Sequence, residues 1–153
     1  MRNMSLGAAV LFLFFIAGPL VGQTAAQLDE ILEEEHLSYG SAAYLLLGVS
    51  DIAGEPENRE TATETLEARG VHLPEADVDA RINLGELSLL TMQVLEIDGG
   101  FMYRLLEDPR YAARELEFLG VIQDTAFPRM RVSGERGLRI VNRAIALREE
   151  GQL

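Results

Sequence analysis

One segment of this chain occurs twice, and the two copies lie 50 residues apart. Each copy reads as a helix ended by glycine, a loop and a second helix. The shared positions are Ala62, Leu66, Gly70 and Val71 in the first copy and Ala112, Leu116, Gly120 and Val121 in the second. Without a gap, Arg81-Ile82 then matches Arg131-Val132, Leu90 matches Ile140 and Leu95 matches Ile145. Such periods are typical of one supersecondary unit used repeatedly, with each unit burying its apolar face against its neighbours.

The repeat predicts an all-α domain built from helix–loop–helix units. Two full units are expected over residues 58–98 and 108–149, and one partial unit over residues 28–50. In all three, an apolar residue precedes a capping residue and an apolar helix; the pairs are Leu37-Ser38, Ile82-Asn83 and Val132-Ser133.

Capping residues predict where the helices begin. A short polar side chain at the N-cap accepts a hydrogen bond from an unpaired amide of the first turn. Ser38, Asn58, Asn83, Asp108 and Ser133 each precede a helical pattern. Glu86 completes a capping box with Asn83, and Pro109 suits the first helical position. Glycines predict three helix ends, at Gly70, Gly99-Gly100 and Gly120. Shorter helical segments are expected after Gln27 and at Phe101–Leu106.

Residues 1–26 are predicted to form a secretory signal peptide. Arg2 is the only charged residue among them, and an apolar run from Leu6 to Ala17 follows it. Small residues at Thr24-Ala25-Ala26 suit cleavage after Ala26. An uncleaved membrane anchor is the alternative, although the apolar run is shorter than the roughly 20 residues that a spanning helix needs. We therefore expect a protein of the periplasm or cell surface with one folded domain, residues 27–153. It would meet the membrane only through this segment, if uncleaved.

Charge is distributed unevenly along the chain. The formal net charge is −12, and the sequence contains neither lysine nor cysteine. Residues 27–99 carry 17 acids and 3 arginines, whereas residues 100–153 carry 8 acids and 9 arginines. The acidic first half argues against a nucleic-acid partner, and the absence of cysteine excludes disulfides. The arginine-rich half suits an anionic polymer, the acidic half of a neighbouring molecule, or a mixed solvated surface, which is the simplest interpretation.

The order of motifs within a unit resembles that of the S-layer homology (SLH) module. Repeats of that family have a helix, a Gly-Ile-like turn, an acidic or proline-containing loop, and an Ile-Thr-Arg-Ala-Glu motif that opens a second helix. Here residues 112–122 resemble the first part and residues 127–135 the second, while the middle unit offers Gly70-Val71, Pro74 and residues 82–86. The resemblance covers most of residues 27–153. It implies a single SLH-like bundle that binds a cell-envelope polymer.

This sequence differs from the family at positions that bind the family's ligand. Tyr39, Leu84 and Gly134 stand where the family has the arginine of its Ile-Thr-Arg motif, and its early tryptophan is absent. Those family positions are understood to hold pyruvylated wall polysaccharide, so the resemblance supports the fold better than it supports this ligand. Arg129 and Arg131 are candidates for a displaced cationic site.

Three further arginines extend the candidate anion site. Arg136, Arg139 and Arg143 are spaced by three and four residues and therefore share one helix face. With Arg129 and Arg131 they offer guanidinium groups for the carboxylates or phosphates of an envelope polymer. The simpler interpretation, which the sequence favours, is a solvated face that pairs with Glu135 and other acids, because exposed ion pairs contribute only ~0–1 kcal/mol.

The middle loop carries acids at calcium-loop spacing. Glu75, Asp77, Asp79 and Glu86 would occupy positions 1, 3, 5 and 12 of such a loop. Position 1 is usually the shorter Asp, and Ala80 stands at position 6, where the sharp turn requires glycine. A solvated acidic loop followed by a helix cap is therefore favoured over a calcium site.

No nucleophile, acid–base pair or phosphate-binding glycine loop emerges from the sequence, so we expect no enzyme and no cofactor. The leading hypothesis is an exported, non-catalytic binding or scaffold module of the cell envelope that contacts an anionic wall polymer. The alternatives are a protein–protein adaptor in an envelope complex, docking through the acidic half, and a calcium-dependent module using the middle loop.

Overall fold

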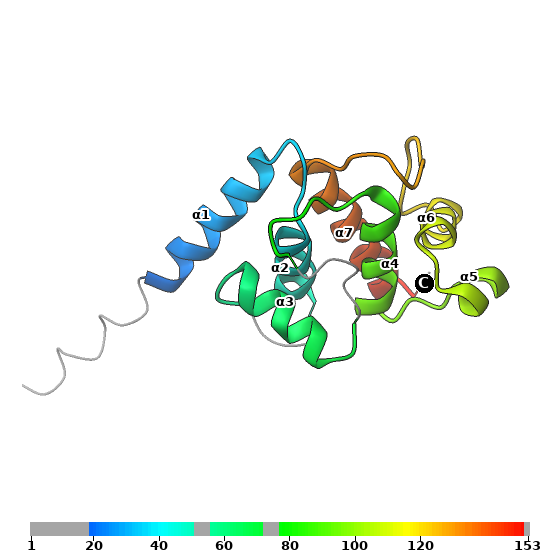
Figure 1. Ribbon diagram of the computed structural model, residues 1–153, viewed down its shortest axis with the longest axis horizontal. Helices are drawn as coiled ribbons and strands as arrows, with labels where there is room; N and C mark the ends of the chain where they lie inside the picture. The colour runs from blue at the N-terminus through cyan, green and yellow to red at the C-terminus, as the bar shows by residue number, and fades with distance from the viewer. Residues whose placement is uncertain (1–18, 51–55, 72–76, 152–153) are drawn as a thin grey trace, which may run out of the picture.

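The computed structural model describes residues 19–50, 56–71 and 77–151, and this part of the chain is all-α, without a β-strand. Figure 1 shows the arrangement of its helices. They are α1 (Pro19–Glu33), α2 (Tyr39–Val49), α3 (Arg59–Ala68), α4 (Leu84–Val94), α5 (Phe101–Leu106), α6 (Pro109–Phe118) and α7 (Gly134–Glu149). The predicted all-helical class is confirmed.

All five predicted N-caps are confirmed. The side chains of Ser38, Asn58, Asn83, Asp108 and Ser133 each accept a hydrogen bond from a first-turn amide of the helix that follows. At Asn83 the bond is reciprocal: its Oδ1 accepts from the Glu86 amide at 3.0 Å, and Glu86 Oε2 accepts from the Asn83 amide at 2.9 Å. Local side-chain chemistry therefore sets where these helices begin.

The predicted helix ends are confirmed at two places and wrong at a third. Gly70 and Gly120, at φ +80° and +77°, follow α3 and α6 in the left-handed conformation that glycine adopts without strain. The helix α4, however, ends at Val94 rather than at Gly99-Gly100. The amide of the buried Ile97 donates a hydrogen bond to the carbonyl of Met92 at 2.9 Å. Glu96 takes the left-handed conformation at φ 52°, because burial of Ile97 requires the chain to turn back there.

The three segments that precede α2, α4 and α7 are joined by main-chain hydrogen bonds. Between the segments before α2 and α4, the Tyr39 amide donates to the Ala80 carbonyl at 2.9 Å. Between the segments before α4 and α7, the Leu84 amide donates to the Met130 carbonyl at 2.9 Å. Between the segments before α7 and α2, the Gly134 amide donates to the Glu34 carbonyl at 2.9 Å. Three segments far apart in sequence thus meet in a closed ring.

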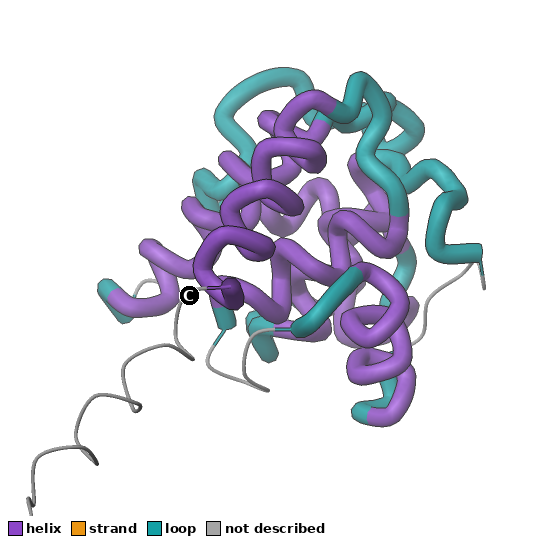
Figure 2. The backbone as a smooth tube through the Cα atoms, turned by 90° about the vertical axis from the view of Figure 1, so that its left-hand side faces the viewer, coloured by secondary structure: helices purple, strands orange, loops and turns teal. Residues whose placement is uncertain are grey.

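Below this ring, α2, α4 and α7 contact one another and enclose the core. Each carries an outer helix: α3 packs on α2, α6 on α4 and α1 on α7. Figure 2 shows these helices in a second view, with the connecting loops in teal. The apolar residues ahead of the three caps, Leu37, Ile82 and Val132, are at most 3% exposed. These three residues are therefore part of the core.

The first helix, α1, packs against the last helix, α7, and so completes the bundle. Gly134, the first residue of α7, lies so close to the main chain at Ile31 and Leu32 that a Cβ there would overlap the Ile31 carbonyl. Glu34 then joins α1 to the next two helices, because its carboxylate accepts from Ser41 Oγ at 2.6 Å and pairs with Arg59 at 3.2 Å. The predicted cleavage point after Ala26 falls inside α1, and these contacts all follow it.

Among the described residues, no helix is both long and apolar enough to cross a membrane. The apolar run of the predicted signal peptide, Leu6 to Ala17, lies outside the described residues.

Candidate functional site

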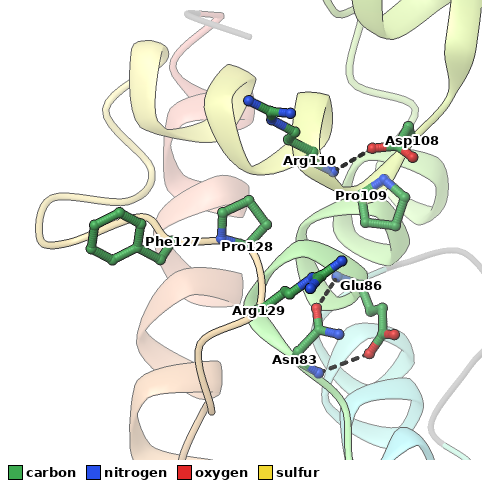
Figure 3. Close-up of a pocket in the computed structure, with 8 residues that line it drawn as sticks. All are labelled: Asn83, Glu86, Asp108, Pro109, Arg110, Phe127, Pro128 and Arg129. Atoms are coloured by element: carbon green, nitrogen blue, oxygen red, sulfur yellow. Dashed lines mark hydrogen bonds between the residues drawn. The ribbon is translucent and has the colours of Figure 1, made fainter.

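A cavity of about 600 Å³ opens where the first turns of α4 and α6 meet the loop at residues 127–129. Its wall combines two capped helix starts, two prolines, an exposed aromatic ring and two arginines (Figure 3). The residues are Asn83, Glu86, Asp108, Pro109, Arg110, Phe127, Pro128 and Arg129. We call this cavity the α4–α6 pocket.

A glycine lets the three parts of this pocket come together. A Cβ placed on Gly85 would lie 3.1 Å from the Cβ atoms of both Pro109 and Pro128 and 3.0 Å from the Pro109 carbonyl oxygen. The Gly85 amide also donates to the Pro128 carbonyl at 2.7 Å. The start of α4 is therefore fixed against both neighbours, and the two prolines that line the pocket have limited backbone freedom.

Two helix N-termini contribute positive potential to the pocket. Unpaired amides and the helix dipole make the first turn of a helix favourable for negative charge. In α4 the carboxylate of Glu86 and the side chain of Asn83 occupy part of this field. In α6, Asp108 Oδ1 accepts from the Arg110 amide at 2.8 Å. Oxygen acceptors and positive helix ends are thus interleaved along one wall.

The arginines of the pocket are available to a ligand. Arg110 and Arg129 are both exposed, and neither guanidinium forms an ion pair with a described residue. Arg129 extends from the loop toward Glu86 and Pro109 (Figure 3). Phe127 is 69% exposed next to Pro128. Cations, apolar surface and hydrogen-bond acceptors on one wall suit a ligand that carries both negative groups and hydroxyls.

The five arginines predicted from the sequence lie in three places. Arg129 lines the α4–α6 pocket. Arg131 is exposed, with Nη1 3.5 Å from Nε2 of His36. Arg136, Arg139 and Arg143 line a separate hollow of about 120 Å³ beside α7. The shared helix face predicted for the last three is therefore observed, but Arg129 and Arg131 do not join it.

Two arginines of the α7 hollow already have acidic partners. Arg136 pairs with Asp124 at 2.7 Å and donates to the Thr125 carbonyl at 2.8 Å, with only 14% of its side chain exposed. Arg139 pairs with Glu135 at 3.2 Å. A ligand at this hollow would compete with those partners, which makes it a weaker candidate than the α4–α6 pocket.

The acids of the predicted calcium loop have other contacts where they are described. Asp77 and Asp79 are exposed, and Asp77 Oδ1 accepts from the Asp79 amide at 3.0 Å. Glu86 faces the Asn83 amide in the capping box. Glu75 lies outside the described residues. Within the described ranges, no three acidic or histidine side chains are grouped as metal ligands would be.

The three positions that the sequence resemblance aligns with arginine are buried in the structure. Tyr39, Leu84 and Gly134 are all buried at the starts of their helices. A charge at such a position would have to be removed from water. In the α4–α6 pocket the guanidinium groups come instead from the exposed Arg110 and Arg129.

Several members of the pocket were not predicted from the sequence as ligand-binding residues. Asp108, Pro109 and Arg110 fit the pattern of a helix start, and Phe127-Pro128 fit the family resemblance. Two signals in the sequence point to them: the N-terminus of a helix as an anion site, and an aromatic residue two positions before Arg129. Residues 108–110 and 127–128 lie near Asn83 only because segments distant in sequence pack together, which a single sequence does not show.

No family model, curated protein or solved structure matches this chain. Its function is therefore inferred from the residues and geometry of the pocket.

Proposed function

We propose that this protein is an exported, non-catalytic module of the cell envelope that binds an anionic polysaccharide in the α4–α6 pocket. The observation that carries the proposal is that two guanidinium groups without a described ion-pair partner, an exposed aromatic ring and two prolines line the same cavity. A chain of sugars with carboxylate or phosphate substituents offers a complementary group to each of these features.

The arginines supply recognition of the negative substituents. A guanidinium binds a carboxylate or phosphate through two parallel hydrogen bonds, which fixes direction as well as distance. Hydrogen bonds to charged groups contribute about 1.5–3 kcal/mol each. Arg110 and Arg129 flank the helix starts, so the helix fields favour the same negative group.

The remaining wall suits the neutral part of the polymer. The ring of Phe127 offers a flat apolar surface for a sugar face, and aromatic side chains contribute much of the contact energy where they become buried. Asn83, Glu86 and Asp108 present oxygen atoms that accept hydrogen bonds from hydroxyls. Their acidic character selects against densely charged polymers such as nucleic acid, in agreement with the net charge of −12.

We further propose that the bundle consists of three SLH-like units, formed by α1–α2, α3–α4 and α6–α7. The cyclic order of the main-chain hydrogen bonds and the packing of each outer helix on the preceding inner one support this assignment. On this view the first unit is more complete than the sequence repeat indicates, because α1 supplies its outer helix. The α4–α6 pocket then lies at the junction of the second and third units.

Co-sedimentation with the source organism's insoluble cell-wall fraction tests this function. The full chain is expected to pellet, and Arg129→Ala or Arg110→Ala to raise the apparent Kd roughly 10- to 100-fold, as loss of one charge-assisted bond would. Arg148→Ala, which removes an exposed arginine from the end of α7, is the matched control and should bind normally.

The same experiment separates the alternatives. If the chain stays in the supernatant, or if Arg148→Ala weakens pelleting as much as Arg129→Ala does, the pocket is not the binding site. Loss of pelleting on addition of chelator would instead direct attention to the acidic loop at residues 75–86.

A further inference from the structure

The surface formed by α5 and the end of α6 is unusually apolar. Five large apolar side chains are exposed there: Phe101 at 78%, Met102 at 44%, Leu105 at 63%, Leu106 at 51% and Phe118 at 85%. Leu105 follows Phe101 by four residues and Met102 by three, so these three share a face of α5. We call these five residues the α5–α6 patch. It lies at the opposite end of the molecule from the start of α1 (Figure 1).

A hollow of about 350 Å³ joins the two helices of the patch. Phe101 and Met102 of α5 and Phe118 of α6 line it, together with Tyr111. Three of the five patch residues therefore border one depression, into which a large side chain from another molecule can insert. Such shape is what apolar anchors of protein interfaces require.

From these observations we propose that the α5–α6 patch is a self-association surface, on which a second copy of this chain packs about a twofold axis. The five side chains present on the order of 600 Å² of mostly apolar surface, at the upper end of what monomers expose. With its polar rim, this approaches the ~800 Å² that each partner contributes to a standard interface.

The charges around the patch favour a second copy over a lipid surface. Arg104 and Arg114 are exposed there without a described ion-pair partner, and so are Glu107 and Glu117. Charges of both signs, with Glu115 also lining the hollow, allow each arginine to face a glutamate of the other copy across a twofold axis. An anionic bilayer would require a predominantly basic rim instead.

The overall charge is compatible with pairing at this end. Of the 25 acidic residues, 17 fall within residues 27–99. The acidic α1 lies at the other end of the molecule (Figure 1). Contact through α5 keeps the acids of α1 in the two copies far apart, where salt screens their repulsion. Such a pair would also present two α4–α6 pockets to one polymer, which increases avidity without any new contact.

Because the sequence contains no cysteine, a single introduced cysteine can be cross-linked specifically to test this proposal. The full chain carrying Leu105→Cys or Phe118→Cys is treated in intact cells with a bis-maleimide. Both variants are expected to give a product at twice the mass of the monomer seen in the same untreated cells. Glu67→Cys, at an exposed position on α3, is the matched control and should remain monomeric. Adding Phe101→Glu to the Leu105→Cys variant should abolish the product.

Three results would overturn the proposal: no dimer product, equal dimer from Glu67→Cys, or a dimer that persists after Phe101→Glu. Monomeric Leu105→Cys protein that floats with phosphatidylglycerol vesicles would also overturn it and would identify the patch as a lipid-binding surface. Circular dichroism shows whether each variant is folded. These exposed positions contribute little to stability, so normal folding is expected.

Discussion

Closure of the bundle requires a residue without a side chain at position 134. The first turn of α7 approaches the main chain of α1 there, and any side chain would overlap the Ile31 carbonyl. From the sequence, Gly134 stood out only as a lost ligand-binding position, because the resembled family has a functional arginine there. A single sequence does not reveal such a contact, since Ile31 and Gly134 are separated by most of the domain.

Replacing this glycine is expected to destabilise the protein. Gly134→Ala should lower the free energy of unfolding by about 1–3 kcal/mol, as overpacking does. A Cβ added at Gly48, in the last turn of α2, would meet no neighbouring side chain or loop within 4 Å. Gly48→Ala is therefore the control, and it should leave stability unchanged or raise it by roughly 0.5–1 kcal/mol. Urea unfolding measures both; equal midpoints would refute the close contact.

Tyr103 provides a second test at the residue scale. Burial, and then the nearby charge of Glu107, raise the pKa of Tyr103 above its ordinary value of 10.0. Because the folded pKa exceeds the unfolded one, the contribution of this tyrosine to stability is complete below about pH 10. It is lost as pH rises through the folded pKa.

Absorbance of the phenolate should therefore show a component that titrates above pH 10 and is missing in Tyr103→Phe. If the variant and the parent titrate identically above pH 10 apart from amplitude, Tyr103 does not have the raised pKa. The other three tyrosines remain in both proteins and serve as the internal reference.

At the scale of elements, the five capped helix starts were predictable. The start of α1, expected after Gln27 but found at Pro19, and the end of α4 were not. N-caps depend on residues within one turn, and all five were found from short polar side chains ahead of apolar runs. The end of α4 depends on where Ile97 is buried, which is a tertiary property. Ion pairs such as that between Arg59 and Glu34 were beyond prediction for the same reason.

The capping box of α4 is expected to act as one unit. Asn83→Ala should cost about 0.5–2 kcal/mol of stability. The double variant Asn83→Ala/Glu86→Ala should cost less than the sum of the two single variants, because both remove the same reciprocal bond pair. Thermal or urea unfolding of all three variants provides the comparison. Strict additivity would mean that the two side chains stabilise α4 independently.

At the scale of the whole molecule, the decisive feature is that the first helix packs on the last. The sequence repeat predicted two full units and the class of fold. It did not show where α1 packs, because the first copy was recognised only in part. The α4–α6 pocket was missed for a related reason, since it forms only when Gly85 meets both Pro109 and Pro128.

Ile31 tests this long-range closure. Its side chain is fully buried in the core, so Ile31→Ala should cost about 2–5 kcal/mol and should lower the midpoint of one cooperative unfolding transition. Leu32→Ala, at the neighbouring half-buried position, is expected to cost less. A negligible effect of Ile31→Ala would mean that α1 is not part of the folded bundle.

The most direct test of the central claim is a map of amide chemical shifts. Polysaccharide released from the source organism's wall fraction is titrated into the ¹⁵N-labelled protein. We predict that shifts concentrate at the α4–α6 pocket, on Asn83, Arg110, Phe127 and Arg129, and saturate with one affinity. Shifts confined to the hollow of Arg136 and Arg143, or no shifts at saturating polymer, would contradict the assignment of this pocket as the binding site.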